Sequence, residues 1–168
     1  MRDAVVATED KRFYRHGGID PEGMMRAFVR NLQHPQRTEG ASTLTQQYIK
    51  NVLVERAVRQ GDLAAADAAR EASGAEGYAR KLREAKLAIA LEKELTKDQI
   101  LEAYLNIAQF GVNTYGVQAA AERYFSKPAS ELTYLEAATI AGITQSPAPT
   151  DPLRNPRAAR DRLDVVLR

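Results

Sequence analysis

The stretch RKLREAKLAIALEKELTKDQILEAYLNIA, residues 80–108, decides the class of fold. Leu87, Leu91 and Leu95 repeat every four residues, a spacing that places side chains on one face of an α-helix. Thr96 is followed three residues later by Gln99, the pattern of a capping box, which indicates that a second helix begins there. The stretch therefore predicts two consecutive helices, the first over 80–95. The second helix is expected to carry the apolar residues Ile100, Leu101, Tyr104, Leu105 and Ala108.

The rest of the chain also favours helices, because strict alternation of apolar and polar residues is nowhere sustained. Further helices are expected over 3–14, from Asp20-Pro21 to Pro35, and over 42–54, 116–125, 133–142 and 157–168. In the helix that begins at Asp20-Pro21, the expected buried stripe consists of Met24, Ala27, Phe28 and Leu32. A polar loop is expected over 36–41. The sequence as a whole therefore predicts an all-α fold.

Length and composition narrow the classes of function. A chain of 168 residues is the size of one domain. The absence of cysteine excludes disulfides, thiolate metal sites and a cysteine nucleophile, and two histidines are too few for a multi-histidine metal centre. A net charge of +2 argues against a dedicated polyanion binder. No stretch approaches the roughly 18 apolar residues of a membrane span, so we expect a soluble chain or a piece of a longer, anchored protein.

Residues 55–78 differ in composition from the rest of the chain. They are rich in alanine and charge, poor in large apolar residues, and interrupted by Gly61, Gly74 and Gly77. Such a segment has little to bury, and we therefore expect a solvated, flexible helical insertion.

Glu9 and Asp10 are adjacent carboxylates followed by cations at Arg12 and Arg15. One interpretation is a solvated helix in which Glu9 pairs with Arg12, three residues on. The alternative is a carboxylate partly desolvated against Phe13, which suits a general base. The residues alone leave both interpretations open.

Two further clusters also allow two interpretations each. The run Ser42-Thr43-Leu44-Thr45-Gln46-Gln47, with Lys50 on the same face, is either an ordinary capped helix start or a site for an anionic or sugar ligand. Arg80, Lys81 and Glu84 form either a surface salt bridge or a phosphate-binding cluster with a carboxylate beside it.

Taken in order, these motifs resemble the peptidoglycan glycosyltransferase domain of bifunctional penicillin-binding proteins and monofunctional transglycosylases, glycosyltransferase family 51. The resemblance extends over about residues 3–167. It rests on Glu9-Asp10 with Phe13, His16 and Gly18; on Gly40-Ala41-Ser42-Thr43-Leu44-Thr45-Gln46-Gln47; on Arg80-Lys81 with Glu84; on Lys97 with Ile100-Leu101-Glu102 and Tyr104-Leu105-Asn106; and on Leu135-Glu136-Ala137-Ala138 through Gly142 to Asn155-Pro156.

The resemblance implies one lysozyme-like helical domain over 1–168, with a cleft between two lobes and a flexible jaw segment at 55–78. It implies polymerisation of lipid II into β-1,4-linked glycan strands, with inversion at the donor sugar and release of undecaprenyl pyrophosphate. The implied location is the outer face of the bacterial cytoplasmic membrane, where such domains are normally anchored by an N-terminal helix that we do not expect within this chain. The implied partners are lipid II, the growing strand, the membrane surface and other cell-wall synthesis proteins, without nucleic acid.

The resemblance also implies roles for individual residues. Glu9 would be the general base that takes the proton from the acceptor's 4-hydroxyl. Glu84 would be the second catalytic residue, holding a divalent cation (Mg2+ or Mn2+) or ordering the neighbouring basic side chains. Substrate-binding positions are implied for Arg12, Ser42, Gln46, Gln47, Lys50, Arg80 and Lys81, and structural support for Asp10, Phe13 and His16. Asn51 stands where some members carry an acidic residue, which weakens the expectation of a metal.

Two other functions compete with this hypothesis. A lysozyme-like glycan hydrolase or lytic enzyme would share the helical fold and the catalytic glutamate, but its leaving group is neutral and needs no cluster of cations. A non-catalytic helical interaction module would gather its basic residues on one outer face.

Overall fold

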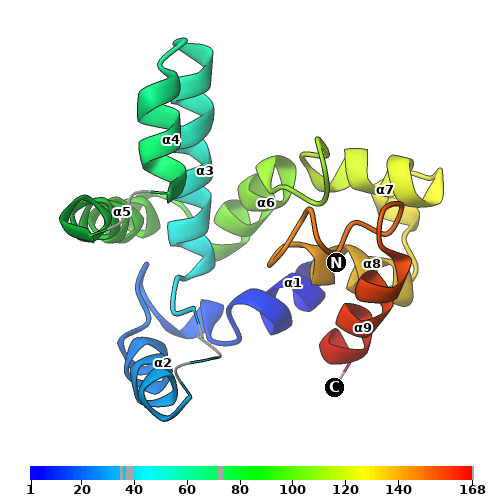
Figure 1. Ribbon diagram of the computed structural model, residues 1–168, viewed down its shortest axis with the longest axis horizontal. Coiled ribbons are helices and arrows are strands. Elements are labelled where there is room, and N and C mark those ends of the chain that lie inside the picture. Colours follow the sequence, from blue (N-terminus) through cyan, green and yellow to red (C-terminus); the bar gives the residue numbers. More distant parts are fainter. Residues whose placement is uncertain (35, 37–39, 72–73, 168) are drawn as a thin grey trace. The chain divides into compact units, whose positions relative to one another are not determined.

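The computed structural model describes residues 1–34, 36, 40–71 and 74–167. Within these residues the chain forms nine α-helices and no strand, which confirms the all-α prediction (Figure 1). The helices are α1 (Arg2–Glu9), α2 (Pro21–Gln33), α3 (Leu44–Arg59), α4 (Leu63–Glu71), α5 (Gly74–Glu94), α6 (Lys97–Ile107), α7 (Val117–Phe125), α8 (Tyr134–Ile143) and α9 (Pro156–Val166). Short 3₁₀ turns add Phe13–Arg15 and Ala129–Glu131.

The helices divide into two compact units. The first consists of Met1–Lys11 and Leu101–Arg168, and the second of Arg12–Ile100. Within the described residues, no helix is both long enough and apolar enough to cross a membrane.

The core of the first unit is built around α8, which packs against α1, α7 and α9. Its buried residues surround the helix axis, as expected of a helix covered on all sides. They are Ala137, Ala138, Ile140, Ala141, Gly142 and Ile143. A capping box stands at the start of this predicted helix, because Thr133 and Glu136 each accept a hydrogen bond from the other's backbone N–H.

A buried carboxylate fixes the loop that follows α6. Asp151 has no exposed surface and accepts hydrogen bonds from the N–H groups of Val112 (3.1 Å) and Leu153 (3.0 Å). Tyr124 donates to the carbonyl of Phe110 (2.9 Å). Gly111 has φ +148°, and a Cβ there would lie 1.8 Å from the Tyr124 hydroxyl oxygen, so no larger residue fits.

In the second unit, α3 packs against α4 and α5. Gly18 has φ +85°, and a Cβ at this position would lie 2.7 Å from the backbone of Ala88 in α5. The Thr43 hydroxyl, just before α3, donates to the carbonyl of Gly18 (2.7 Å). This close approach joins the segment after Phe13 to the start of α3 and to the middle of α5. It therefore brings together the three sequence motifs that these segments carry.

The first helix is shorter than the predicted 3–14. It ends at Glu9, and Asp10 has an extended φ of −156°. The physical reason is the burial of Phe13, whose side chain has no exposed surface and lies beneath Lys97 Nζ, 4.4 Å from the ring centroid. The chain therefore leaves the helix to place this ring. The interpretation in which Glu9 and Arg12 pair along one helix is wrong.

The predicted buried stripe of α2 is also wrong, except at Ala27. Met24, Phe28 and Leu32 are 49%, 61% and 67% exposed. The buried residues of the helix are instead its smallest, Gly23 and Ala27, and a Cβ at Gly23 would meet the carboxylate of Asp20, just before the helix. Asp20 precedes α2 but makes no side-chain capping bond. The α2 helix ends at Gln33, and Pro35 and residues 37–39 of the predicted loop lie outside the described residues.

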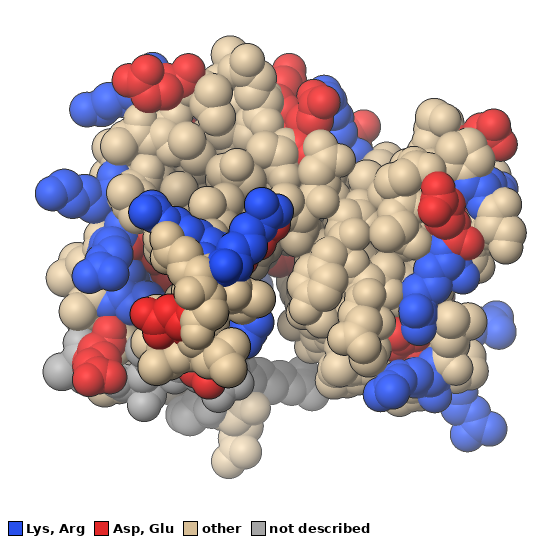
Figure 2. Space-filling model, turned by 90° about the horizontal axis from the view of Figure 1, so that it is seen from above, with Lys and Arg blue, Asp and Glu red and all other residues tan. Residues whose placement is uncertain are grey.

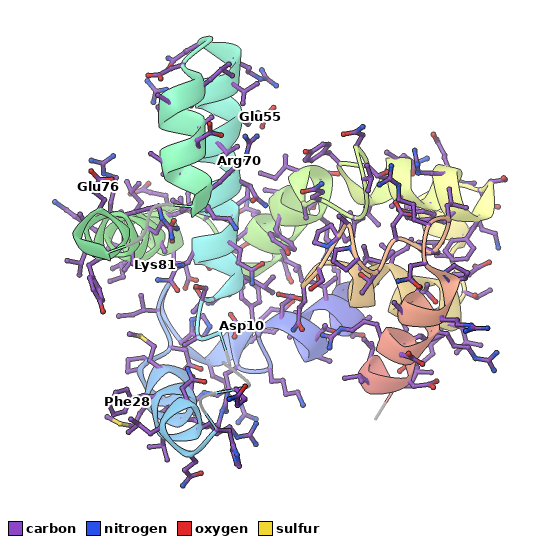
Figure 3. The ribbon with its side chains drawn as sticks, in the orientation of Figure 1. Asp10, Phe28, Glu55, Arg70, Glu76 and Lys81 are labelled. Atoms are coloured by element: carbon purple, nitrogen blue, oxygen red, sulfur yellow. The ribbon has the colours of Figure 1, made fainter. Side chains whose placement is uncertain are left out.

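Residues 55–78 contain the end of α3, all of α4 and the start of α5, with residues 72–73 outside the described part. Ala57 and Ala66 are buried where α3 and α4 lie side by side. Charged side chains such as Glu55 and Arg70 lie on the outside of this helix pair (Figure 3). The predicted helical, solvated character is confirmed, whereas the predicted flexibility stays a prediction. Helix α5 starts earlier than the predicted residue 80.

Candidate functional site

Glu9 lies at the last helical position of α1, in the first unit. Helix α1 is held against α8 and α9, and Val5 on its inner side has no exposed surface. Glu9 is half-buried and Asp10, which follows it, is buried. The α1 packing therefore fixes the point at which a partly shielded carboxylate leaves the helix.

Three side chains from distant parts of the chain surround this helix end. The Thr144 hydroxyl lies 2.5 Å from Glu9 Oε1, and Gln145 Nε2 donates to the carbonyl of Thr8 (3.2 Å). Burial raises the pKa of Tyr104, and the negative charge of Glu9 raises it further. The Tyr104 hydroxyl therefore stays protonated.

The second unit gathers cations around a buried carboxylate. Glu84 in α5 is 1% exposed; its Oε1 lies 2.6 Å from Arg80 Nη1 and its Oε2 lies 3.1 Å from Lys81 Nζ. Lys81 Nζ also donates to the Ser42 hydroxyl (2.8 Å), just before α3 (Figure 3). We call these four residues, Ser42, Arg80, Lys81 and Glu84, the cation cluster.

The start of α3 completes the surroundings of the cation cluster. The N-terminal cap is Thr43 rather than Ser42, because the Thr43 hydroxyl accepts from Gln46 N–H (3.2 Å) and Gln46 Oε1 accepts from Thr43 N–H (2.9 Å). The side-chain oxygen of Gln46 is therefore engaged in holding the helix start. Gln47 and Lys50, further along α3, are half-buried.

A second polar network connects the start of α3 to α5 and to the start of α6. Glu92 Oε1 accepts from the Thr45 hydroxyl (2.5 Å) and from Lys97 Nζ (2.8 Å). Lys97 Nζ also lies 3.5 Å from His16 Nδ1 and above the ring of Phe13. The network ties α3, α5 and the start of α6 to Phe13 and His16. The supporting role expected of these two residues stays a prediction.

Arg12 is engaged by acidic side chains at the start of α2. Its Nη2 lies 3.3 Å from Asp20 Oδ1, and its Nη1 is paired with Glu22. Asp20 therefore holds Arg12 instead of capping α2. A substrate-binding role for Arg12 would require it to share or leave these contacts.

The residues near Glu84 do not fit a divalent cation. Both oxygens of Glu84 face positively charged nitrogen atoms, which repel a metal ion. No group of three His, Cys, Asp or Glu side chains able to hold a metal occurs among the described residues. The requirement for Mg2+ or Mn2+ stays a prediction.

Figure 2 shows lysine and arginine side chains in several separate groups, with aspartate and glutamate side chains among them and tan surface between.

The structure thus brings most of the predicted site residues into two sets, one in each unit. The second unit holds the cation cluster and the Phe13–His16 network, and the first unit holds Glu9. The residues that sequence reasoning missed are Thr144, Gln145, Glu92 and Lys97. Lys97 opens the fourth motif and could have been chosen on that ground, whereas nothing local to Thr144 signals a contact with a residue 135 positions away.

Comparison with known proteins confirms the resemblance. The family model described as Transglycosylase matches residues 1–168. Penicillin-binding protein 1A of Mycolicibacterium smegmatis is 41% identical over 167 residues, which cover 99% of this chain and 20% of that protein. Penicillin-binding protein 1A of Rickettsia bellii is 38% identical over 170 residues (99% and 19%), and penicillin-binding protein 1F of Bacillus subtilis is 36% identical over 167 residues (99% and 21%). The chain spans about a fifth of the length of these relatives.

Proposed function

Since the chain belongs to the transglycosylase family, we propose that it is a peptidoglycan glycosyltransferase that polymerises lipid II into β-1,4-linked glycan strands. The observation that carries this proposal is the cation cluster. Arg80 and Lys81 are held by the buried carboxylate of Glu84, and Lys81 reaches Ser42 at the start of α3. Guanidinium and ammonium groups beside a helix N-terminus suit the pyrophosphate of a polyprenyl leaving group.

The proposed reaction is one direct displacement at the donor sugar. Glu9 takes the proton of the acceptor's 4-hydroxyl while that oxygen forms a bond to the donor C1. The bond from C1 to the pyrophosphate oxygen breaks, and its electron pair leaves with the undecaprenyl pyrophosphate. Attack from the side opposite the leaving group inverts the configuration from α to β. The step requires one base and a means of stabilising the anion released.

The cation cluster would stabilise that anion. Lys81 is 46% exposed and so remains accessible to a ligand, whereas Arg80 is 18% exposed. Arg80 Nε is buried with no hydrogen-bond partner among the described residues, so the guanidinium group has a donor that Glu84 does not use. We assign Glu84 as a positioning residue that acts through Arg80 and Lys81. Lys50, Gln47, Gln46 and Arg12 are proposed as further substrate contacts.

A lytic activity gains no support from these contacts. A hydrolase that cleaves between two sugars releases a neutral alcohol, which needs protonation rather than a cluster of cations. The cluster of two cations on one buried carboxylate therefore favours a transferase with an anionic leaving group.

Where a divalent cation is required, we propose that the pyrophosphate of the substrate supplies its main ligands. Magnesium often binds through phosphate oxygens and few carboxylates, which is consistent with the absence of a three-ligand group in the described part of the chain. Such an ion would leave the stability of the substrate-free chain unchanged.

We further propose that α2 contacts the membrane surface in which lipid II is embedded. Its exposed residues include Met24, Met25, Phe28, Val29 and Leu32, which are 43–67% exposed. At 100° per residue these five positions lie within an arc of about 140°, opposite the buried Gly23 and Ala27. A contiguous apolar helix face of this kind suits the boundary of a lipid bilayer. A location at the outer face of the cytoplasmic membrane, with other cell-wall synthesis proteins nearby, accords with this surface and with the relatives.

The experiment compares Lys81→Met with Lys86→Met, an exposed lysine on the same helix and outside the cation cluster. Initial rates of lipid II polymerisation in detergent are followed on gels. We expect Lys81→Met to lower the rate by about tenfold or more, as for other groups that stabilise a developing anion, while Lys86→Met stays near the parent. Equal rates for both variants would contradict the role of the cation cluster.

A further inference from the structure

Thr144 makes a contact that the proposed chemistry has not yet used. It is the residue directly after α8, and its hydroxyl oxygen lies 2.5 Å from Glu9 Oε1 and 2.8 Å from the carbonyl of Ala141. All three residues belong to the first unit. The hydroxyl thus lies between the carboxylate at the end of α1 and a carbonyl in the last turn of α8.

We propose that Thr144 is a positioning residue for Glu9, holding the carboxylate in the orientation in which it receives the acceptor's proton. The inference rests on the proposed function, because it concerns the same base. The Glu9 side chain can rotate about several bonds, and its carboxylate can therefore take several orientations at the helix end. A hydrogen bond from the Thr144 hydroxyl to the ionised carboxylate restricts these torsions and is stronger than one between neutral groups.

The hydroxyl has one proton and two acceptors within reach. While Glu9 is ionised, Thr144 donates to Glu9 Oε1, since a carboxylate is the stronger acceptor. When Glu9 takes the acceptor's proton on its other oxygen, Oε2, the oxygen Oε1 becomes the carbonyl oxygen of the acid and still accepts from Thr144. The carbonyl of Ala141 is the alternative acceptor for the same hydroxyl proton. No proton is gained or lost by Thr144, so the step stays balanced in both states.

A neighbouring contact fixes the same two segments to each other. Gln145 Nε2 donates to the carbonyl of Thr8 (3.2 Å), one of the last carbonyls of α1 that lack a partner within the helix. Side chains at two consecutive positions after α8 therefore reach the end of α1. This backbone anchor sets the distance from Thr144 to Glu9 independently of the Thr144 hydroxyl.

Thr139 provides a matched comparison within α8. Its hydroxyl donates to the carbonyl of Leu135 (2.8 Å), four residues earlier, and this bond resembles the one from Thr144 to Ala141. Thr144 differs by its second contact, with Glu9. A variant at Thr139 therefore reports the cost of removing a threonine hydroxyl from this helix without touching Glu9.

The test measures kcat and KM for lipid II polymerisation by the parent, Thr144→Val, Thr144→Ser and Thr139→Val. We expect kcat of Thr144→Val to fall by roughly tenfold to a hundredfold with KM little changed, as for misplacement of a reacting group. Thr144→Ser, which keeps the hydroxyl, should recover most of this loss. Thr139→Val should match the parent. Equal kcat for Thr144→Val and the parent, or an equal loss in Thr144→Ser, would overturn the inference.

Glu9→Gln in the same assay separates this inference from the proposed function. If Glu9→Gln is inactive and Thr144→Val is fully active, Glu9 remains the proposed general base, but the proposed positioning role of Thr144 is wrong. If Glu9→Gln is as active as the parent, the proposed base itself fails.

A double-mutant cycle in urea unfolding gives a readout that needs no activity. The unfolding equilibrium constants of the parent, Thr144→Val, Glu9→Ala and the double variant are compared. We expect the effect of Thr144→Val to be about twofold to tenfold smaller when Glu9 is already alanine, because residues in direct contact are energetically coupled. Additive effects would overturn the contact on which the inference rests.

Discussion

Helices α6 and α2 carry similar apolar spacing and meet opposite environments. In α6, Ile100, Leu101, Tyr104 and Leu105 are all at most 7% exposed. In α2, Phe28 and Leu32 are more than 60% exposed, while Gly23 and Ala27 face the protein. The spacing of apolar residues shows that they share one helix face. It does not show whether that face is covered by protein, by solvent or by a membrane surface.

The two helices differ in which of their residues face the rest of the protein. Helix α6 buries large side chains, whereas the residues that α2 buries are a glycine and an alanine. The large side chains of α2 lie on the opposite side, where no described part of the chain covers them. The two helices therefore predict different responses to the same substitution.

The largest expected effect comes from removing a leucine side chain from each helix. Leu101→Ala should lower the free energy of unfolding by about 2–5 kcal/mol, because it opens a cavity in the core. Leu32→Ala should change it by about 0.5 kcal/mol or less, because that side chain is 67% exposed. Urea unfolding followed by circular dichroism measures both. Equal losses of unfolding free energy would mean that protein covers Leu32 as it covers Leu101. The proposed difference between the two helices would then be wrong.

Binding to lipid vesicles tests what covers α2. The double variant Phe28→Ser and Leu32→Ser should bind vesicles of phosphatidylcholine with phosphatidylglycerol about tenfold or more weakly than the parent, because it loses two large apolar side chains. The matched control is Leu63→Ser with Leu153→Ser, two leucines that are each 63–67% exposed outside α2. Sedimentation with vesicles gives the bound fraction. If the control binds as weakly as the α2 variant, α2 is not the contact surface.

A smaller effect is expected at the loop that follows α6, which a buried charge holds in place. Burial alone would raise the pKa of Asp151, but the N–H groups of Val112 and Leu153 donate to its carboxylate and hold the pKa below its ordinary value. The folded pKa thus lies below that of the unfolded chain, about 3.9 for aspartate. The added stability is present above that pH and disappears as the pH falls through the folded pKa.

The unfolding midpoints of the parent and Asp151→Asn, measured from neutral to acidic pH, test this assignment. The parent should be more stable near neutral pH, and the difference should shrink as Asp151 becomes protonated. A difference that stays constant with pH would show that the charge of Asp151 does not contribute. The loop would then be held without a contribution from this charge.

Local signals in the sequence were sufficient for much of the fold. The capping box of Thr133 and Glu136 and the pairing of Thr96 with Gln99 involve residues three positions apart, and both are present. The end of α1 at Glu9 could not be predicted in this way. It depends on where Phe13 is buried, which involves residues far away in the sequence. Tertiary packing here outweighs the local preference for a longer helix.

The contacts of the candidate site also fall into those that local sequence spacing predicts and those that depend on tertiary packing. Arg80, Lys81 and Glu84 lie within one helical turn, so their pairing follows from sequence spacing alone. Ser42 joins them from 39 residues away, and its position was implied by the resemblance to a family rather than by any spacing. Thr144 and Gln145 reach the end of α1 from the far end of the chain. No local pattern marks either residue, and only the packing of α8 against α1 brings them there.

The central claim is that this chain is a glycosyltransferase with Glu9 as its base, and one measurement tests it most directly. Lipid II polymerisation by the parent chain and by Glu9→Gln is compared in detergent with Mg2+ present, and the products are resolved on a gel. Glutamine keeps the shape of the side chain but cannot take a proton at neutral pH. The account predicts glycan polymer from the parent and none from Glu9→Gln, with both proteins folded by circular dichroism. Polymer from both would contradict it.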